Sequence, residues 1–371
     1  MVFISHLVDE GADMEPMPNP SAYFGELPIA IYQIDVELPV DGTTSTLSAA
    51  STTTSCAPPG EPMPVQKTLY WGSAWRGVLG WELRSLLCPF PKKPQCKMCL
   101  IRRSCPYFRL MEDQSEASGI QEAPRSYVLH PSTNGCPNNM RIMLTLFGES
   151  IRYVPAVLKA LQNGETTGLG ASRISYHIQG IREILPKGKT LEIPIDFDGL
   201  SNFGSGAPLS DWMPTAVNLQ PPISCRLLTP VRLRKKGKYL GRMDWAYFFE
   251  TLIRRVETLQ MLFASGDPLG KERFVTLCSQ FSGLAPRFEA LAWQEYSRWS
   301  NRQRKKVPMG GLIGEAVFDD GCPWLYPWLA LAEIVHVGKG ASMGLGKVEV
   351  GTPSHGSSTV NAHGGRRRPR E

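Results

Sequence analysis

The chain of 371 residues lacks any long uninterrupted run of apolar residues. Its most apolar stretch, "CPWLYPWLALAEIVHV" (322–337), contains Glu333 and two prolines and is too short to cross a bilayer. The opening segment "MVFISHLVDEGADMEPMPNP" has no basic residues before its short apolar run, which argues against a signal peptide. We therefore expect a cytoplasmic location, where the nine cysteines favour metal binding or buried thiols over disulfides.

An excess of one charge is also nearly absent. The formal net charge is +6, but the last six residues, "RRRPRE", hold four arginines and one glutamate and so account for half of it. The rest of the chain is close to balanced. Any basic surface must therefore be a local patch and not a general field.

The glycine-rich motifs of nucleotide-binding proteins are missing, although one glycine phrase occurs twice. G-x-G-A-S stands at 168–172 and again at 338–342, 170 residues apart. Five residues after Gly338 comes Met343, and five after Gly340 comes Leu345, so the spacing G-x-x-x-x-G-K-[ST] is not met. Both copies follow a helical pattern and precede a strand pattern. The phrase therefore most simply marks the same helix-to-strand joint in two related units.

Apolar periodicity predicts the order β-α-β-β-α-β in each half of the chain. The first half has strands at 28–40, 125–131, 141–148 and 173–181, and helices at 69–87 and 150–163, the latter ended by Gly164. The second half has a strand or hairpin at 223–242, two strands around the glycine turn near 310, a final strand at 344–351, and helices at 244–264 and 323–337. Asp244 is the expected N-cap. This order is that of the ferredoxin-like unit, so the predicted fold is α+β with two such units in tandem.

The same patterns divide the chain into segments. We expect a flexible arm over 1–27, a first domain over 28–197, a linker over 198–218, a second domain over 219–352 and a disordered basic tail over 353–371. A Ser/Thr/Ala/Pro-rich stretch at 41–64 reads as a disordered insertion in the first domain.

A cysteine-rich segment at 88–107 follows the first predicted helix. Its spacing is Cys88-x7-Cys96-x2-Cys99-x5-Cys105, and four thiolates in so short a stretch suit a tetrahedral structural zinc ion. Cys136 could replace one ligand. An iron–sulfur cluster and unligated buried thiols are the alternatives.

The second half resembles a known family through "GGLIGEAVF…LALAEIVHVGKGASMGLGKVEV". It is similar to the C-terminal domain of the CRISPR-associated endoribonucleases that cut precursor CRISPR RNA, which belong to the RAMP superfamily. "YWGSAWRGVLGWELR" and the cysteine segment leading into "CPYF" carry a weaker resemblance in the first half. The resemblance covers about 28–40 and 65–351. It implies tandem ferredoxin-like domains and an RNA-contacting glycine loop, here Gly338, Gly340, Gly344 and Gly346, with charge added by Lys339 and Lys347.

Two basic clusters in the second half suit an RNA backbone with unpaired bases, because aromatic residues stand among the cations. The alternative for each is a solvated charged hairpin. The first cluster comprises Arg232, Arg234, Lys235, Lys236 and Lys238, and the second comprises Arg298, Arg302, Arg304, Lys305 and Lys306 with Tyr296 and Trp299 nearby.

Cleavage of RNA without a metal needs a base for the 2′-OH, an acid for the leaving oxygen and a cation for the phosphorane, and it yields a 2′,3′-cyclic phosphate. The family resemblance implies a histidine near the first helix, often with a Tyr or Lys. This chain departs from that pattern, because none of its six histidines falls between His6 and His130. The candidates are Lys67, Tyr70, Arg76 and His336. We interpret His177 as structural and His130, which precedes Pro131, as a turn residue.

Three functions compete on this evidence. The first is a metal-independent endoribonuclease that recognises a CRISPR repeat and cuts the precursor to mature crRNA. The second is an inactive RAMP subunit that holds a guide RNA end among other effector subunits, which the missing histidine favours. The third is a metal-stabilised RNA-binding regulator. The predicted partners are repeat RNA or crRNA, with other CRISPR effector subunits as further candidates.

Overall fold

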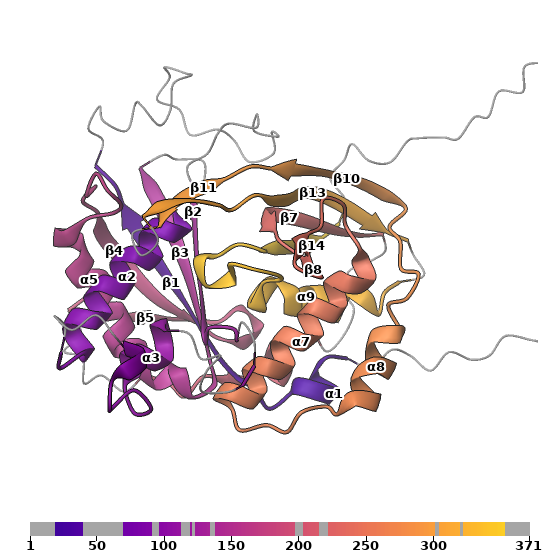
Figure 1. Ribbon diagram of the computed structural model, residues 1–371, viewed down its shortest axis with the longest axis horizontal. Coiled ribbons are helices and arrows are strands. Elements are labelled where there is room, and N and C mark those ends of the chain that lie inside the picture. The colour runs from indigo at the N-terminus through magenta and orange to yellow at the C-terminus, as the bar shows by residue number, and fades with distance from the viewer. Residues whose placement is uncertain are drawn as a thin grey trace, which may run out of the picture.

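The computed structural model describes residues 19–39, 70–90, 96–112, 119–120, 123–133, 138–196, 203–214, 222–300, 304–319 and 322–352. The segments predicted as an insertion (41–64) and a basic tail (353–371) lie outside these ranges, as do Lys67, Cys136 and Arg302. Two units, each a sheet with helices, lie next to each other, the first in indigo to magenta and the second in orange to yellow (Figure 1).

The first unit is a ferredoxin-like domain. Its elements are β1 (Pro28–Glu37), α2 (Gly72–Leu87), β2 (Tyr127–Thr133), β3 (Asn139–Phe147), α5 (Val154–Thr167) and β4 (His177–Ile184), with an added edge strand β5 (Thr190–Ile193). The antiparallel sheet has the order β2-β3-β1-β4-β5. A short helix, α3 (Pro106–Met111), packs against α2 after the cysteine segment.

The second unit repeats this topology. Its elements are β7 (Ile223–Val231), α7 (Trp245–Phe263), β10 (Phe288–Gln294), β13 (Gly311–Phe318), α9 (Leu325–Val335) and β14 (Val348–Gly351), and the sheet order is β10-β13-β7-β14. The tandem ferredoxin-like prediction is confirmed. The repeated glycine phrase lies between α5 and β4 in the first unit and between α9 and β14 in the second, as expected.

Strand β1 shows how the sequence alternation joins the two units. Ala30, Tyr32 and Ile34 point into the core beneath α2 and α5, whereas Ile29 and Ile31 belong to the core of the second unit. Side chains on a strand alternate between its two faces, so β1 contributes side chains to the cores of both units. The first sheet therefore has α2 and α5 on one face and the second unit on the other.

Helix α7 begins as predicted. The Asp244 carboxylate accepts a hydrogen bond of 3.0 Å from the Tyr247 backbone N–H. This satisfies one of the backbone donors that the first turn of a helix leaves unpaired. The rest of the helix buries an apolar stripe that includes Phe248, Leu252 and Val256.

The end predicted for the helix over 150–163 is wrong. The stretch begins as a 3-10 turn (Gly148–Tyr153), and α5 then runs past Gly164 to Thr167. Gly164 serves packing, because a Cβ there would collide with Tyr176 and Val78. The helix ends at Gly168, whose φ of +74° suits glycine.

Two elements of the second unit were not predicted. Helix α8 (Lys271–Ser279) buries only Leu277, and the edge strand β10 has no fully buried residue. Both segments have too few apolar residues at regular spacing to predict a helix or a strand. Strands β11 (Ser297–Ser300) and β12 (Lys305–Pro308) continue β10 and β13 into a long ribbon, which reaches toward the first domain (Figure 1).

The arm over 1–27 and the linker over 198–218 differ from expectation where they are described. Helix α1 (Ser21–Phe24) lies against α7, and Phe24 and Leu27 are buried. In the linker, β6 (Ala207–Pro208) pairs with β1, and α6 (Leu209–Trp212) follows it. Apolar residues within polar stretches anchor both segments. No helix among the described residues is long and apolar enough to cross a bilayer.

Candidate nucleic-acid interface

Arg232, at the end of β7, joins the elements predicted to contact RNA. Its Nε donates to the Gly310 carbonyl and one terminal nitrogen donates to the Pro308 carbonyl, both at 3.0 Å. Its guanidinium lies 4.4 Å from the ring centre of Tyr239. Its own carbonyl accepts from the Lys339 N–H at 3.0 Å. The Arg232 side chain therefore links the β11–β12 ribbon to the hairpin of β8 (Arg234–Lys235) and β9 (Lys238–Tyr239), and its backbone carbonyl joins the glycine loop to the same point.

This placement corrects the sequence interpretation of Arg232. The sequence analysis placed Arg232 in a basic cluster for RNA contact. In the structure its side chain is buried and donates to two backbone carbonyls. Burial lowers its pKa from the usual value. Arg232 can position the surfaces that surround it, but its donors already serve the protein.

The glycine loop over 338–346 folds against the first domain. Gly344 has a φ of +81°, and a Cβ there would lie 2.7 Å from Tyr70 Oη and 2.8 Å from the His130 Cα. Only glycine allows so close an approach at this backbone conformation. The 3-10 turn η5 (Ala341–Met343) contacts both β2 and α2.

Most backbone amides of this loop already have acceptors inside the protein. The N–H groups of Gly346 and Lys347 donate to Pro230 and to the Thr229 hydroxyl, at 3.0 and 2.9 Å. Four others also donate within the protein: Lys339, Met343, Gly344 and Leu345. The loop is thus chiefly a structural joint between the domains.

Tyr70 lies at the start of α2, and its hydroxyl donates to the Met343 carbonyl of the loop. Its ring meets Tyr296 of the ribbon edge-on, with 5.9 Å between ring centres. Burial raises the Tyr70 pKa strongly, so the phenol stays neutral. The structure therefore brings together the start of the first helix, the loop and the ribbon, which the sequence analysis had proposed separately for catalysis or RNA contact.

Two histidines, one from each domain, meet behind the loop. The rings of His130 and His336 are 5.4 Å apart, with exposures of 8% and 3%. His336 holds a φ of +59° at the end of α9, and its Nδ1 lies 3.1 Å from the Leu345 carbonyl. His130 bonds to the Gly344 backbone. Burial lowers both pKa values, to about 4 for His130 and well below the usual value for His336, so both are neutral at pH 7.

His130 is a residue that the sequence interpretation missed. It lies inside β2 and not in a turn. Its place in the run "RSYVLHP", between apolar residues, was the available signal. The partner that gives it a role, His336, is 206 positions away and could not be paired with it from one sequence.

Lys347 also points inward. Its Nζ donates to the Glu333 carbonyl at 2.9 Å and lies 4.0 Å from the Glu333 carboxylate. Burial lowers its pKa, as it does for a lysine taken from water. Lys347 is therefore turned away from any ligand on the loop surface.

The exposed cations lie on the two hairpins. Lys236 and Lys238 stand on the β8–β9 hairpin, whereas Lys235 pairs with Asp244 at 2.9 Å. On the ribbon, Arg304, Lys305 and Lys306 are exposed, and Trp299 is 59% exposed beside them. An exposed indole among cations matches what unpaired bases require. These side chains keep the RNA-binding prediction open.

Arg76 and His177 do not join this group. Arg76 donates to the Met111 carbonyl at 3.3 Å, toward α3. His177 is exposed on the first domain and lies 3.2 Å from Glu165. Lys67, three residues before Tyr70, stays a candidate from the sequence alone.

The cysteine segment sits at the far end of α2. Cys88 is the C-cap of α2, Cys96 opens a 3-10 turn (Cys96–Met98), and Cys105 precedes α3. The Cys99 N–H donates to the Cys96 carbonyl at 3.1 Å. The four thiols are free, and no group of three ligands among the described residues is arranged to hold a metal.

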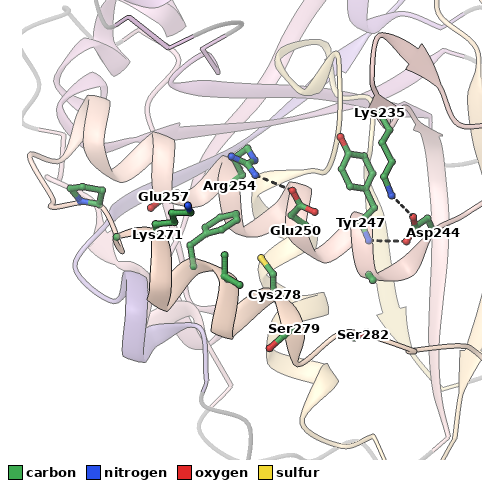
Figure 2. Close-up of a pocket in the computed structure, with 15 residues that line it drawn as sticks. Lys235, Asp244, Tyr247, Glu250, Arg254, Glu257, Lys271, Cys278, Ser279 and Ser282 are labelled. Atoms are coloured by element: carbon green, nitrogen blue, oxygen red, sulfur yellow. Dashed lines mark hydrogen bonds and ion pairs between the residues drawn. The ribbon is translucent and has the colours of Figure 1, made fainter.

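A groove of about 800 Å³ lies between α7 and α8 (Figure 2). Its charges are mixed and paired, because Lys235 contacts Asp244 and Arg254 contacts Glu250, each at 2.9 Å. Phosphates would have to displace these carboxylates. The groove therefore does not suit a polyanion.

Two family models match the chain. Residues 225–348 match the CRISPR-associated endoribonuclease Cas6, and residues 59–197 match a family described as the N-terminal domain of AF_1859. These spans fall in the second and first ferredoxin-like domains. No curated protein matches the chain.

The chain also has distant matches among solved structures of Cas6 and Cas6-related proteins. Thermus thermophilus Cas6 is 14% identical, with a TM-score of 0.46 over 87% of this chain and 98% of the other. A partial Cas6-RT-Cas1–Cas2 complex is 13% identical, with a TM-score of 0.47 over 88% of this chain and 46% of the other. The product of a Cas6-related gene from Pyrococcus furiosus is 7% identical, with a TM-score of 0.33 over 87% and 98%.

Proposed function

We propose that this chain is a CRISPR-associated endoribonuclease of the Cas6 type, which binds repeat RNA and cuts precursor crRNA. The observation that carries the proposal is the convergence on Arg232. Both basic hairpins contact the buried Arg232 side chain, and the glycine loop is bonded to the backbone carbonyl of the same residue. A surface built in this way presents its exposed cations in fixed relative positions.

We place the RNA backbone along the exposed cations of the two hairpins. Lys236 and Lys238 on one side, and Lys305 and Lys306 on the other, would neutralise phosphates. Trp299 would stack on an unpaired base. The loop would approach RNA through residues 340–342, because most of its other amides donate within the protein.

The proposed reaction is attack of a 2′-OH on the adjacent phosphate, giving a 2′,3′-cyclic phosphate and a free 5′-OH, with no metal in the chemistry. Of the candidates, Tyr70 fits a positioning role, because its hydroxyl is bound to Met343 and its pKa is raised. The burial of His336 fits the same role. Lys67 is left as the candidate for charge stabilisation or proton transfer, and Arg76 as a weaker one.

The test is a cleavage assay in EDTA with the protein in excess over labelled repeat RNA from the host's own array. A 2′-deoxy nucleotide at the cut site is the control. One cut that persists in EDTA and disappears with the deoxy substrate is expected. In the same assay we expect Lys67→Ala to slow cleavage at least about 100-fold, the range of one general acid or base.

A different outcome has a defined meaning. Tight and specific binding without a cut would overturn the nuclease mechanism. It would favour a subunit that holds the guide RNA end. The sequence has no histidine between His6 and His130, which agrees with such a subunit.

We also propose a structural zinc ion at Cys88, Cys96, Cys99 and Cys105. Three of these residues lie at the ends of successive elements. Burial raises the pKa of the Cys96 thiol most, followed by the charge of Glu112, and Cys88 and Cys105 are near enough to add to the shift. Closing the four thiols on one ion would tie α2 to α3. Purified protein is expected to contain one zinc per chain and to melt at a lower temperature after chelation. Metal-free protein whose melting ignores the chelator would exclude the site.

A further inference from the structure

The second sheet ends at β10, which has a strand neighbour on one side only. The sheet order is β10-β13-β7-β14, and in the part of the chain that the structure describes β10 pairs with β13 alone. Figure 1 shows β10 on the rim of the second unit. Its sequence, "FEALAWQ" (288–294), contains no lysine or proline, and its register against β13 has no shift. Lysine, proline and bulges are devices that protect edge strands, so this edge is open to pairing with another strand.

The backbone groups that face the open edge belong to alternate residues of β10. The Met309 N–H donates to the Tyr296 carbonyl at 2.7 Å, and the same register continues without a shift to Gln294 opposite Gly311. In an antiparallel ladder, every second residue directs both its N–H and its C=O to the same neighbouring strand. The even-numbered residues of β10 therefore bond to β13. Three odd-numbered residues direct these groups outward: Glu289, Leu291 and Trp293.

The segment 287–295, "RFEALAWQE", is complementary to its own reverse about Leu291. If two copies of it lie antiparallel across a two-fold axis at Leu291, each position meets the one equally far on the other side of the axis. Alanines then face each other next to the axis, at 290 and 292. Arg287 faces Glu295 at both ends of the pairing. Opposite charges at directly opposed positions stabilise an antiparallel pair.

The outward backbone groups select this register. They are satisfied only when odd-numbered residues meet odd-numbered residues, so that each pair exchanges both hydrogen bonds. With the axis at Leu291, that residue meets its own copy and Glu289 meets Trp293. With the axis at 292, Glu289 would oppose Glu295, and like charges at opposed positions are destabilising.

The charged side chains at the ends of the segment are accessible. Arg287 is exposed, and its Nε lies 3.9 Å from the exposed Asp319 carboxylate, a separation and exposure typical of a weak surface pair. Glu295 is also exposed, and its Oε1 accepts from the Trp293 indole at 2.6 Å. A carboxylate accepts more than one hydrogen bond, so Glu295 can also bind an arginine.

We propose that two copies of this chain associate through β10 and join their four-stranded sheets into one continuous sheet. Each copy contributes the same surface, as a closed two-fold dimer requires. The β11–β12 ribbon begins at Ser297, six residues from the axis, so at about 3.4 Å per residue the two ribbons begin about 40 Å apart. Each copy keeps its own ribbon, and the association does not depend on the proposed nuclease reaction.

The test is sedimentation velocity of the purified full-length protein without RNA, over a series of concentrations. We expect a monomer–dimer equilibrium. Leu291→Pro should weaken dimerisation at least about tenfold, because proline removes the outward N–H at the axis while β10 keeps its bonds to β13. Ser297→Pro is the matched control, since it changes an odd-numbered position of the same edge outside the paired segment. It should dimerise like wild type, and melting temperatures check that both variants fold.

Charge variants test the register without a proline. Arg287→Glu opposes two glutamates at each end of the pairing, and Glu295→Arg opposes two arginines. Each variant alone should dimerise about tenfold more weakly than wild type. An equimolar mixture of the two should form a heterodimer of near wild-type affinity, because opposite charges then meet again at both ends.

Three results would overturn the proposal. The first is a wild-type protein that stays monomeric at every concentration. The second is a folded Leu291→Pro variant that dimerises like wild type. The third is a mixture of Arg287→Glu and Glu295→Arg that associates no more tightly than either variant alone, which would show that the copies meet through another surface or register.

Discussion

Replacing Arg232 should loosen the frame that holds the RNA-binding elements. Arg232→Met removes two charge-assisted hydrogen bonds of 3.0 Å to the Gly310 and Pro308 carbonyls and the contact with the Tyr239 ring. Such bonds contribute roughly 1.5–3 kcal/mol each, and a partly desolvated cation–π contact about 1 kcal/mol. Methionine retains part of the apolar packing. These losses sum to at least about 4 kcal/mol, so we expect the free energy of unfolding, measured by urea denaturation, to fall by about that amount.

Two matched variants separate geometry from charge. Arg232→Lys keeps the charge but not the planar fork that reaches two carbonyls, so it should lose about 2–3 kcal/mol. Lys236→Met removes an exposed cation of the adjoining hairpin. It should leave stability within about 0.5 kcal/mol and lower the slope of log K against log salt for RNA binding by about 1.

The reasoning about Arg232 has a clear point of failure. If Arg232→Met weakened RNA binding while leaving the unfolding curve unchanged, its guanidinium would contact RNA directly. If Arg232→Lys were as stable as wild type, the two hydrogen bonds to the carbonyls would contribute little. Arg232 would then not stabilise the arrangement of the elements around it.

Three further predictions test the contact between the domains. The pKa of His130 is about 4 in the folded protein and 6.5 when unperturbed, so the unfolded chain binds more protons between these pH values. The free energy of unfolding should therefore fall by roughly 3 kcal/mol as the pH drops from 6.5 to 4. His130→Gln should reduce this pH dependence, and His177→Gln should leave it unchanged. Gly344→Ala should destabilise by more than 2 kcal/mol, whereas Gly170→Ala, with open space around it, should cost about 1 kcal/mol, as read from thermal melts. Tyr70→Phe should slow cleavage by misplacing the loop while leaving the pH profile of the rate unchanged, and a shifted profile would show that Tyr70 transfers a proton.

The fold could be predicted because buried faces of helices and strands place apolar residues at regular intervals in the sequence. Strand β1 alternates, and α7 carries an apolar stripe behind a capping aspartate. The elements that were missed, α8 and β10, bury little and so leave little period to read. The position of Gly164 inside α5 was misread because its reason is tertiary, namely the approach of Tyr176 and Val78.

The site was only partly predictable, for a related reason. Composition identified the two basic clusters, but it could not show that Arg232 is buried while Lys236, four positions later, is exposed. Likewise the loop lysine Lys347 bonds to Glu333, which only the packing of α9 on β14 brings near. Which charges face the ligand is decided by contacts between distant segments, and one sequence does not state them.

The repeated glycine phrase makes the same point within one chain. In the first domain it forms a turn in which a Cβ added to Gly170 would meet no atom within 4 Å, and Leu169 bridges to Ile174. In the second domain the same letters pack Gly340 against Leu345, and the loop that follows closes on Tyr70. Both copies hold their two glycines at positive φ and form a helix-to-strand joint, and the loop that contains the second copy also contacts the first domain. The glycine phrase occurs in both domains, so the phrase alone does not predict RNA contact. The proposed role of the second copy depends on its contact with the first domain and on the basic hairpins that contact Arg232.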